Sequence, residues 1–284
     1  MKPTQVYAIL GYPVGHSRSP AMHNRAFSEL GLDAVYVPFE VHPSQLAAAI
    51  SGLRALNIAG ANITLPHKTA VMALLDRVEP RAQAIGAVNT LFWEGDLLCG
   101  DNTDAPGLAH SLEEAGVELA NTAATIVGAG GAARAAVVGL AQAGAAKITV
   151  SARRLDAASA LIQSLQNPLQ QTRCTLTTCD MGDLSSAFKH TDILVQATSA
   201  TLGESDAAHT FAASLPLAAL PPHATVTDLV YKPLETTVLA AAKARGLKTV
   251  DGLGMLLHQG ALAFERWTNC KAPIAAMRAA LIES

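Results

Sequence analysis

Short apolar runs alternate with amphipathic stretches along the first hundred residues. The apolar runs have the length of buried strands and predict β-strands at 6–10, 34–41 and 60–65. The amphipathic stretches repeat apolar residues at helical spacing and predict helices at about 20–30, 43–56 and 68–75. Because strands alternate with helices, we expect a mostly parallel sheet.

The pattern changes near residue 104. Before it, two strand segments at 88–92 and 97–100 flank a turn, and after it residues 105–120 predict a helix. A new strand–helix–strand unit then begins, and the chain is helical from about Met255. We therefore expect an α/β protein of two domains, residues 1–104 with 255–284 and residues 105–254.

The composition and charge of the chain argue against several classes of protein. Half of the 284 residues are hydrophobic, 15% are charged and the formal net charge is −3, so the chain offers no basic face for nucleic acid. The longest apolar run near the start is too short for a signal peptide or a membrane span, which favours a cytoplasmic protein. Its four cysteines form no C-x-x-C pair, so we expect reduced thiols and no metal site.

A glycine-rich loop follows one predicted strand and opens a helix. In "TIVGAGGAA", Gly128, Gly130 and Gly131 allow a tight turn, and Ala133 completes the G-x-G-x-x-A spacing. A helix N-terminus at this point presents free N–H groups to a pyrophosphate. The sequence therefore predicts a dinucleotide site. A glycine-containing turn that binds no ligand would show the same sequence pattern.

The end of the following strand bears on which dinucleotide binds. NAD sites usually place a carboxylate about 20 residues beyond the loop, whereas this strand ends with Arg153 and Arg154. Two guanidinium groups suit the 2′-phosphate of NADP. Asp156 follows closely, so NAD stays possible, as does a solvated arginine turn.

Small polar clusters fall at the ends of the predicted elements outside the nucleotide unit. They comprise hydroxyls, amides, one ammonium and one carboxylate, in Ser17, Ser19, Asn62, Thr64, Lys68, Asn89, Asn102, Thr103 and Asp104. Such a lining suits a polyhydroxylated acid. Each could also cap a helix or satisfy a turn; Ser19, for example, precedes Pro20 as a helix cap would. Lys68 stands in an otherwise core-like segment, which suggests a role in proton transfer.

Seven segments, in order, resemble the shikimate/quinate dehydrogenase family: "GYPVGHSRSPAMHN", "GANITLPHK", "AIGAVNTL", "GDNTDAPG", "VGAGGAARA", "DLVYKPLETTVL" and "DGLGMLLHQGALAFERW". The resemblance implies two α/β domains with a cleft between them, the C-terminal helices returning to the substrate domain. It also implies the reversible NADPH-linked reduction of 3-dehydroshikimate to shikimate.

The same resemblance implies roles for particular residues. Lys68 and Asp104 match the catalytic pair. The substrate ligands would be Ser17, Ser19, Asn62, Thr64, Asn89, Tyr231 and Gln259. The cofactor would contact Gly128, Ala129, Gly130, Gly131, Ala132, Ser151, Arg153, Arg154, Thr198 and Gly252.

The chain departs from the family pattern after the second nucleotide strand. Ala152-Arg153-Arg154 replaces the Asn-Arg-Thr common in NADP-dependent members, and "ATSATLG" replaces an ATSxGM-like segment. The sequence leaves quinate or an aminoshikimate open as the substrate, and a non-catalytic NADP-binding regulator as a more distant alternative. It is compatible with a monomer or a homodimer.

Overall fold

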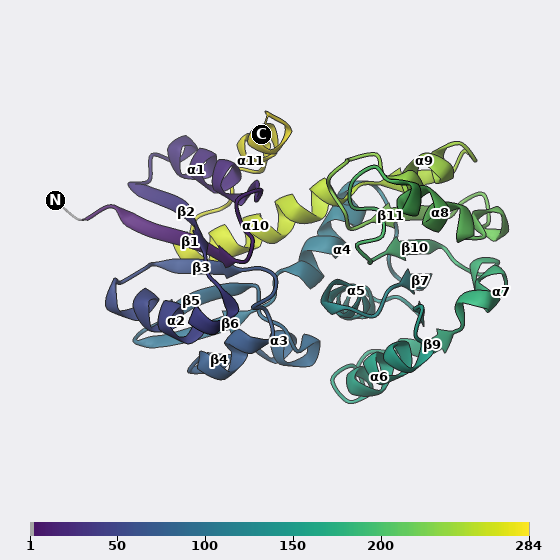
Figure 1. Ribbon diagram of the computed structural model, residues 1–284, viewed down its shortest axis with the longest axis horizontal. Coiled ribbons are helices and arrows are strands. Elements are labelled where there is room, and N and C mark those ends of the chain that lie inside the picture. Colours follow the sequence, from purple (N-terminus) through teal and green to yellow (C-terminus); the bar gives the residue numbers. More distant parts are fainter. Residues whose placement is uncertain (1–2, 284) are drawn as a thin grey trace. The chain divides into compact units, whose positions relative to one another are not determined.

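The computed structural model describes residues 3–283, and the chain divides into two compact units (Figure 1). Unit 1 comprises Met1–Thr103 with Leu257–Ser284, and unit 2 comprises Asp104–Leu256. Each unit contains a six-stranded sheet flanked by helices, which confirms the α/β fold class.

The sheet of unit 1 has the strand order β2-β1-β3-β5-β6-β4. Its strands are β1 (Gln5–Gly11), β2 (Ala34–Glu40), β3 (Gly60–Ile63), β4 (Arg77–Val78), β5 (Thr90–Glu94) and β6 (Leu97–Asp101). Strands β2, β1 and β3 are parallel, as are β4 and β6, whereas β5 runs antiparallel to β3 and β6. The carboxyl ends of β1, β3 and β6 and the beginning of β5 therefore lie at one edge.

The helices of unit 1 cover both faces of this sheet. They are α1 (Ser19–Glu29), α2 (Leu46–Ala55), α3 (Pro80–Ile85), α10 (Gly252–Thr268) and α11 (Ile274–Glu283), with short 3₁₀ turns η1 (Pro43–Gln45) and η2 (Ala70–Leu74). Helix α10 begins in unit 2 and continues into unit 1. Because side chains alternate along a strand, Ala8 and Leu10 of β1 pack with Ile50 of α2 on one face. On the other face, Tyr7 stacks on Phe27 of α1.

Gly60 of β3 leaves room for the indole of Trp267 to pack against this second face of the sheet. A Cβ atom at Gly60 would lie 2.5 Å from the Trp267 ring, closer than carbon atoms can approach. The indole N–H donates to the Leu91 carbonyl at 2.8 Å. Gly60 therefore allows α10 to be anchored to the sheet through a single large side chain.

Two predicted helices are shorter than expected. Over 68–75 only a 3₁₀ turn, Ala70–Leu74, forms, and the Lys68 carbonyl before it accepts a hydrogen bond from the distant Val88 N–H at 2.8 Å. The helix predicted over 105–120 is α4 (Asp104–Glu114). It ends where Gly116 adopts a positive φ of 70°, a conformation that favours glycine and stops a helix.

The sheet of unit 2 is entirely parallel, with the order β12-β11-β10-β7-β8-β9. Its strands are β7 (Ala123–Val127), β8 (Lys147–Ser151), β9 (Thr175–Cys179), β10 (Ile193–Gln196), β11 (Thr225–Asp228) and β12 (Lys248–Val250). Counted along the chain, this is the order 3-2-1-4-5-6 of dinucleotide-binding Rossmann domains, whose switch point lies between the first and fourth strands.

Helices connect the successive parallel strands of this sheet. They are α5 (Gly131–Gln142), α6 (Leu155–Gln166), α7 (Leu184–Phe188), α8 (Asp206–Ser214) and α9 (Thr237–Lys243), with 3₁₀ turns η3 (Met181–Asp183) and η4 (Leu217–Ala219). Leu184, Phe188, Leu194 and Val226 belong to one buried apolar cluster beneath α7 and α9. Within residues 3–283, no helix has the length and apolarity needed to cross a membrane.

Candidate functional site

The predicted substrate residues of unit 1 gather at one edge of its sheet. Asn62 is the next-to-last residue of β3, Asn89 directly precedes β5 and Thr103 follows β6. Asn62 pairs with Thr90 across the antiparallel β3–β5 ladder, so strand register brings together polar residues far apart in sequence. Gln259 reaches the same edge from α10.

Hydrogen bonds join these side chains into one buried network. Asn62 Nδ2 donates to the Asn89 carbonyl at 3.0 Å and to Thr90 Oγ1 at 3.2 Å. Asn89 Nδ2 donates to Thr103 Oγ1 at 3.0 Å and to Gln259 Oε1 at 3.4 Å. Asn89 Oδ1 accepts from the Thr103 N–H at 2.8 Å. Because these groups are at most 9% exposed, their mutual hydrogen bonds replace those that water would supply.

A buried carboxylate fixes the turn that carries Thr103. Asp101 accepts from the backbone N–H of Asn102 at 2.7 Å and from Arg81 at 2.7 Å. The Arg81 Nε also donates to the Asn102 carbonyl at 2.9 Å. Arg266 of α10 lies 3.6 Å from the same carboxylate and 4.2 Å from the centre of the Phe92 ring. The charge of Asp101 thus ties β6, α3 and α10 together beneath the polar network.

Ser17 lies in the connection between β1 and α1, and Ser19 is the first residue of α1. The sequence allowed Ser19 to be the cap of α1, but the helix begins at Ser19 and its preceding residue, Arg18, forms no side-chain cap. Ser17 Oγ accepts the Ser19 N–H at 3.3 Å instead. The Ser19 hydroxyl, 5% exposed, is therefore not used in capping.

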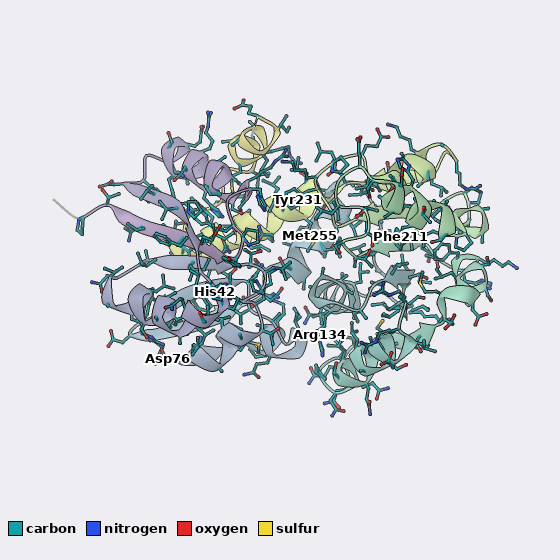
Figure 2. The ribbon with its side chains drawn as sticks, in the orientation of Figure 1. His42, Asp76, Arg134, Phe211, Tyr231 and Met255 are labelled. Atoms are coloured by element: carbon teal, nitrogen blue, oxygen red, sulfur yellow. The ribbon has the colours of Figure 1, made fainter. Side chains whose placement is uncertain are left out.

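Thr64 and Lys68 follow β3 in the connection that leads to η2, and both are half-buried. Asp104, also half-buried, is the first residue of α4. Lys68 belongs to unit 1 and Asp104 to unit 2, so their action as a pair stays a prediction. Tyr231, labelled in Figure 2, is half-buried in the connection between β11 and α9, and its role as a substrate ligand stays a prediction too.

The glycine loop of unit 2 lies at the switch point of its sheet. Gly128 has a φ of 129°, and a Cβ there would lie 2.9 Å from the Ala197 carbonyl at the end of β10. Gly130 and Gly131 border open space, and no side chain caps the start of α5. Gly128 to Ala132 therefore offer a narrow backbone turn and uncapped N–H groups, which is the geometry that a pyrophosphate requires.

The end of β8 places two arginines beside this loop. The Ser151 carbonyl accepts the Gly128 N–H at 2.8 Å, which joins β8 to the loop. Arg154 forms a bidentate pair with Asp156, at 3.3 and 3.0 Å. Arg153 is exposed and has no ion-pair partner within residues 3–283. Of the two arginines, Arg153 is thus the one whose guanidinium is available to a phosphate.

Sequence reasoning missed a buried aspartate behind Thr198. Asp228, fully buried, accepts from Gln196 Nε2 at 3.2 Å, from the Val230 N–H at 3.0 Å and from Thr236 Oγ1 at 2.7 Å. Burial raises the pKa of Asp228, and these donors oppose the rise. Gln196 Oε1 in turn accepts the Thr198 N–H at 2.6 Å, so Asp228 holds the loop after β10 through Gln196.

Gly252 has a packing explanation alongside its predicted cofactor role. A Cβ at Gly252 would lie 2.8 Å from the Leu229 and Val230 carbonyls. Any larger residue would push α10 away from the end of β11. Contact of Gly252 with the cofactor stays a prediction.

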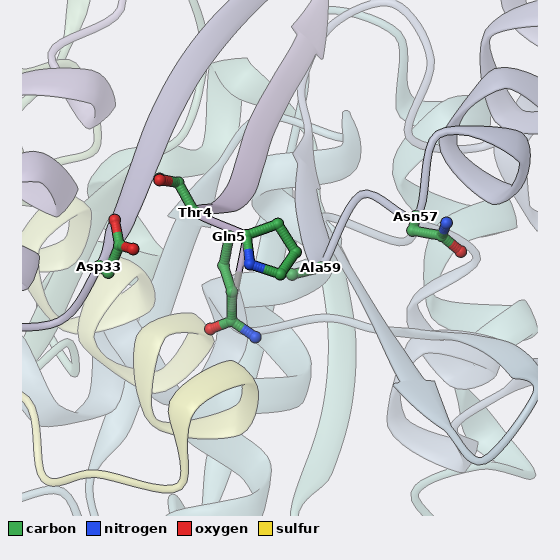
Figure 3. A pocket seen from close by; sticks show the side chains of 6 residues that line it. Thr4, Gln5, Asp33, Asn57 and Ala59 are labelled. Atoms are coloured by element: carbon green, nitrogen blue, oxygen red, sulfur yellow. The ribbon is translucent and has the colours of Figure 1, made fainter. Parts of the chain in front are cut away.

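A hollow of about 430 Å³ opens at the opposite edge of the unit 1 sheet (Figure 3). It is lined by residues that precede or begin β1, β2 and β3: Pro3, Thr4, Gln5, Asp33, Asn57 and Ala59. Because the polar network lies at the carboxyl ends of the same parallel strands, this hollow is not part of the candidate site.

Comparisons with known families match most of the chain. Residues 9–91 match the shikimate dehydrogenase substrate binding domain, residues 108–209 match shikimate/quinate 5-dehydrogenase, and residues 252–282 match the shikimate 5′-dehydrogenase C-terminal domain. A shikimate dehydrogenase (NADP(+)) of Symbiobacterium thermophilum is 44% identical over 280 residues, which cover 99% of this chain and 94% of that protein.

Solved structures give the same result. The Thermus thermophilus shikimate 5-dehydrogenase in complex with NADP(H) and shikimate is 37% identical, with a TM-score of 0.85 over 98% of this chain and 99% of that one. The quinate dehydrogenase of Corynebacterium glutamicum in complex with NAD is 27% identical, with a TM-score of 0.89 over the full length of both chains.

Proposed function

Because this chain belongs to the shikimate dehydrogenase family, we propose that it catalyses the reversible NADPH-dependent reduction of 3-dehydroshikimate to shikimate. The observation that carries the proposal is the buried network of Asn62, Asn89, Thr103 and Gln259 at one sheet edge. A set of amides and hydroxyls held in fixed orientations suits a ring with several hydroxyl groups.

On the substrate side, each polar cluster has a distinct task in this proposal. Ser17 and Ser19 bind the carboxylate of the ligand, for which two hydroxyl donors are suited. Asn62, Thr64, Asn89 and Gln259 bind the ring hydroxyls, with Tyr231 as a further ligand. The hydrogen bonds that lock Asn89 support this assignment, because a preorganised site binds without losing side-chain freedom.

Lys68 and Asp104 handle the proton. Reduction of the ketone needs a proton at its oxygen, and oxidation of shikimate needs its removal from the hydroxyl. An ammonium and a carboxylate that share this task titrate as a unit, so we assign the proton to the pair and not to one residue. The position of Lys68 in a half-buried turn after β3 supports its role, since such a side chain has little purpose as a surface charge.

The dinucleotide site of unit 2 fits NADP. The Gly128–Gly130 turn and the uncapped start of α5 would hold the pyrophosphate, with Ala132 in the first turn of that helix. Arg153 would bind the 2′-phosphate, with Arg154 and Ser151 beside it, and Thr198 and Gly252 would line the nicotinamide half. When bound, the nicotinamide supplies the hydride. The arginine at position 153, where NAD sites carry an acidic residue, favours NADP.

The proposal includes the cellular compartment and the oligomeric state of the enzyme. Cys99, Cys174, Cys179 and Cys270 are free thiols, which supports a reducing compartment such as the cytoplasm. The chain would act as a monomer or a homodimer.

Initial rates with shikimate and quinate, each with NADP and with NAD, test the proposed function. We expect shikimate with NADP to give the highest kcat/KM. Preference for quinate with NAD would favour the activity of the Corynebacterium glutamicum neighbour. Binding of NADP without oxidation of any of these acids would favour a regulatory protein.

A further inference from the structure

Tyr36 of β2 belongs to the buried aromatic cluster of unit 1, and its side chain reaches Asn62. Its ring is 1% exposed, and its hydroxyl donates to Asn62 Oδ1 at 2.7 Å. Burial raises the pKa of Tyr36 well above its ordinary value, and a hydrogen bond with the Ser19 side chain partly opposes the rise. The neutral phenol therefore contacts Asn62, one of the predicted substrate ligands.

The hydrogen bonds that Asn62 forms within the protein leave its side chain able to accept a further hydrogen bond but not to donate one. Both hydrogens of its Nδ2 are directed into the protein, to the Asn89 carbonyl and to Thr90 Oγ1. One lone pair of Oδ1 is taken by the Tyr36 hydroxyl. A primary amide has two donors and two acceptor lone pairs, so Asn62 retains a single acceptor. In this arrangement it can accept a hydrogen bond from a ligand hydroxyl but has no hydrogen left to donate.

Tyr36 is itself held by two neighbouring residues of α1 that have no role in the proposed function. His23 stacks on the Tyr36 ring, with centroids 4.4 Å apart and planes at 19°. Asn24 brackets the Tyr36 backbone: its Oδ1 accepts the Tyr36 N–H at 2.7 Å, and its Nδ2 donates to the Tyr36 carbonyl at 2.9 Å. Because β2 is an edge strand, these backbone groups have no neighbouring strand on that side, and Asn24 takes its place.

We propose that Tyr36, fixed by His23 and Asn24, is a positioning residue that orients the Asn62 amide so that its oxygen accepts from one ring hydroxyl of the substrate. The proposal rests on the proposed function, since it concerns how that site selects its ligand. Without the phenol, Oδ1 loses its fixed donor, and the amide is held only through its two Nδ2 hydrogen bonds.

The chain offers a matched control for removing this hydroxyl. Tyr7 is the register partner of Tyr36 on the adjacent strand β1, and it is also 1% exposed within the same aromatic cluster. Its hydroxyl donates to Gln5 at 3.4 Å, toward the amino end of the strand. Tyr36→Phe and Tyr7→Phe thus remove the same atom from the same layer, and only the first removes it from Asn62.

The test measures dissociation constants for shikimate and for three analogues that each lack one ring hydroxyl. We expect Tyr36→Phe to weaken shikimate binding about tenfold, close to the net value of the one hydrogen bond that a well-oriented Asn62 oxygen accepts from the ligand, and Tyr7→Phe to leave it within about twofold. For one analogue, the one without the hydroxyl that meets Asn62, the effect of Tyr36→Phe should fall to about twofold or less. NADP binding should not change in either variant.

A second variant, Asn24→Ser, should weaken shikimate binding in the same direction without altering the phenol, because it frees the Tyr36 backbone. Equal weakening of all four ligands by Tyr36→Phe would indicate a general loss of packing and overturn the proposal, as would equal effects of Tyr36→Phe and Tyr7→Phe. If the wild-type chain neither binds nor oxidises shikimate, the proposed function itself fails, which the wild-type measurement reveals before any variant is compared.

Discussion

His23 should make unit 1 sensitive to acid. The imidazole is fully buried, and neither of its nitrogens has a hydrogen-bond partner within residues 3–283. It is enclosed by the rings of Tyr36, Phe264 and Trp267. Burial strips the charged imidazolium of its hydration, and no side chain within residues 3–283 hydrogen-bonds either nitrogen in return, so the pKa of His23 falls to about 3.

The sign and size of the effect follow from linkage. In the unfolded chain His23 binds a proton below its ordinary pKa of about 6.5, whereas in the folded chain it stays neutral until about pH 3. Above about pH 6.5 His23 therefore does not lower the free energy of unfolding. As the pH falls from about 6.5 toward about 3, proton binding by the unfolded chain lowers the free energy of unfolding progressively. Each pH unit costs about 1.4 kcal/mol, so the free energy of unfolding should fall by about 2 to 3 kcal/mol between about pH 6.5 and pH 4.5 through this residue alone.

The assay compares wild type with His23→Phe, which keeps a flat ring in the stack and removes the titrating nitrogens. Both tryptophans of the chain, Trp93 and Trp267, belong to unit 1, so tryptophan fluorescence during urea unfolding reports this unit. At neutral pH the variant should be as stable as wild type or more so, because a buried polar group without partners is removed. At about pH 4.5 it should be more stable by a further 2 to 3 kcal/mol.

An exposed histidine of the same unit provides the control. His42 contacts Ser44 and the Tyr12 ring at the surface, and His42→Gln should follow the wild-type pH dependence. If the stability difference between His23→Phe and wild type were the same at both pH values, His23 would not be held neutral by its surroundings, and the reasoning would be refuted.

Three further predictions concern the reaction and unit 2. Lys68→Ala should lower kcat about 10²- to 10⁴-fold with a smaller effect on KM, and near-normal turnover in steady-state assays would remove Lys68 from the mechanism. Arg153→Ala should weaken the binding of NADP much more than the binding of NAD in titrations. Arg154→Ala should have less effect, because Arg154 is paired with Asp156. Equal losses for both cofactors in Arg153→Ala would mean that Arg153 does not bind the 2′-phosphate. Asp228→Asn should destabilise unit 2 by about 1 to 3 kcal/mol in thermal unfolding, because an amide nitrogen would face donors that the carboxylate accepts, and an unchanged transition would show that these hydrogen bonds contribute little.

The alternation of apolar and polar residues identified most of the elements that position the site. It predicted the strands that become β1, β2 and β3, and the strand–loop–helix of the glycine motif, because these depend on local periodicity. It placed a helix at 68–75, where the Lys68 carbonyl instead pairs with Val88, a contact that no local pattern reveals. Strand β4 has only two residues and gave no periodic signal.

The supporting residues of the site were harder to find. Tyr36 reads as an ordinary core aromatic in a strand, and only the register of β2, β1 and β3 brings its hydroxyl to Asn62. Thr90 looks like a strand residue until the antiparallel pairing of β5 with β3 places it beside Asn62. Asp228 ends a strand as many aspartates do, and its partners come from the end of β10 and from the residue that precedes α9. A charged group at the end of a predicted strand is a sequence signal that could have suggested Asp228, whereas Tyr36 and Thr90 lie inside predicted strands and carry no such signal.

In the proposed reaction, Lys68 and Asp104 act together on one oxygen of the substrate. A crystal structure of the chain with shikimate and NADP bound tests it most directly. The account predicts that the Lys68 ammonium and the Asp104 carboxylate both lie within hydrogen-bond distance of the hydroxyl that is oxidised. A complex in which the two side chains contact different groups, or in which either does not reach the substrate, would contradict it.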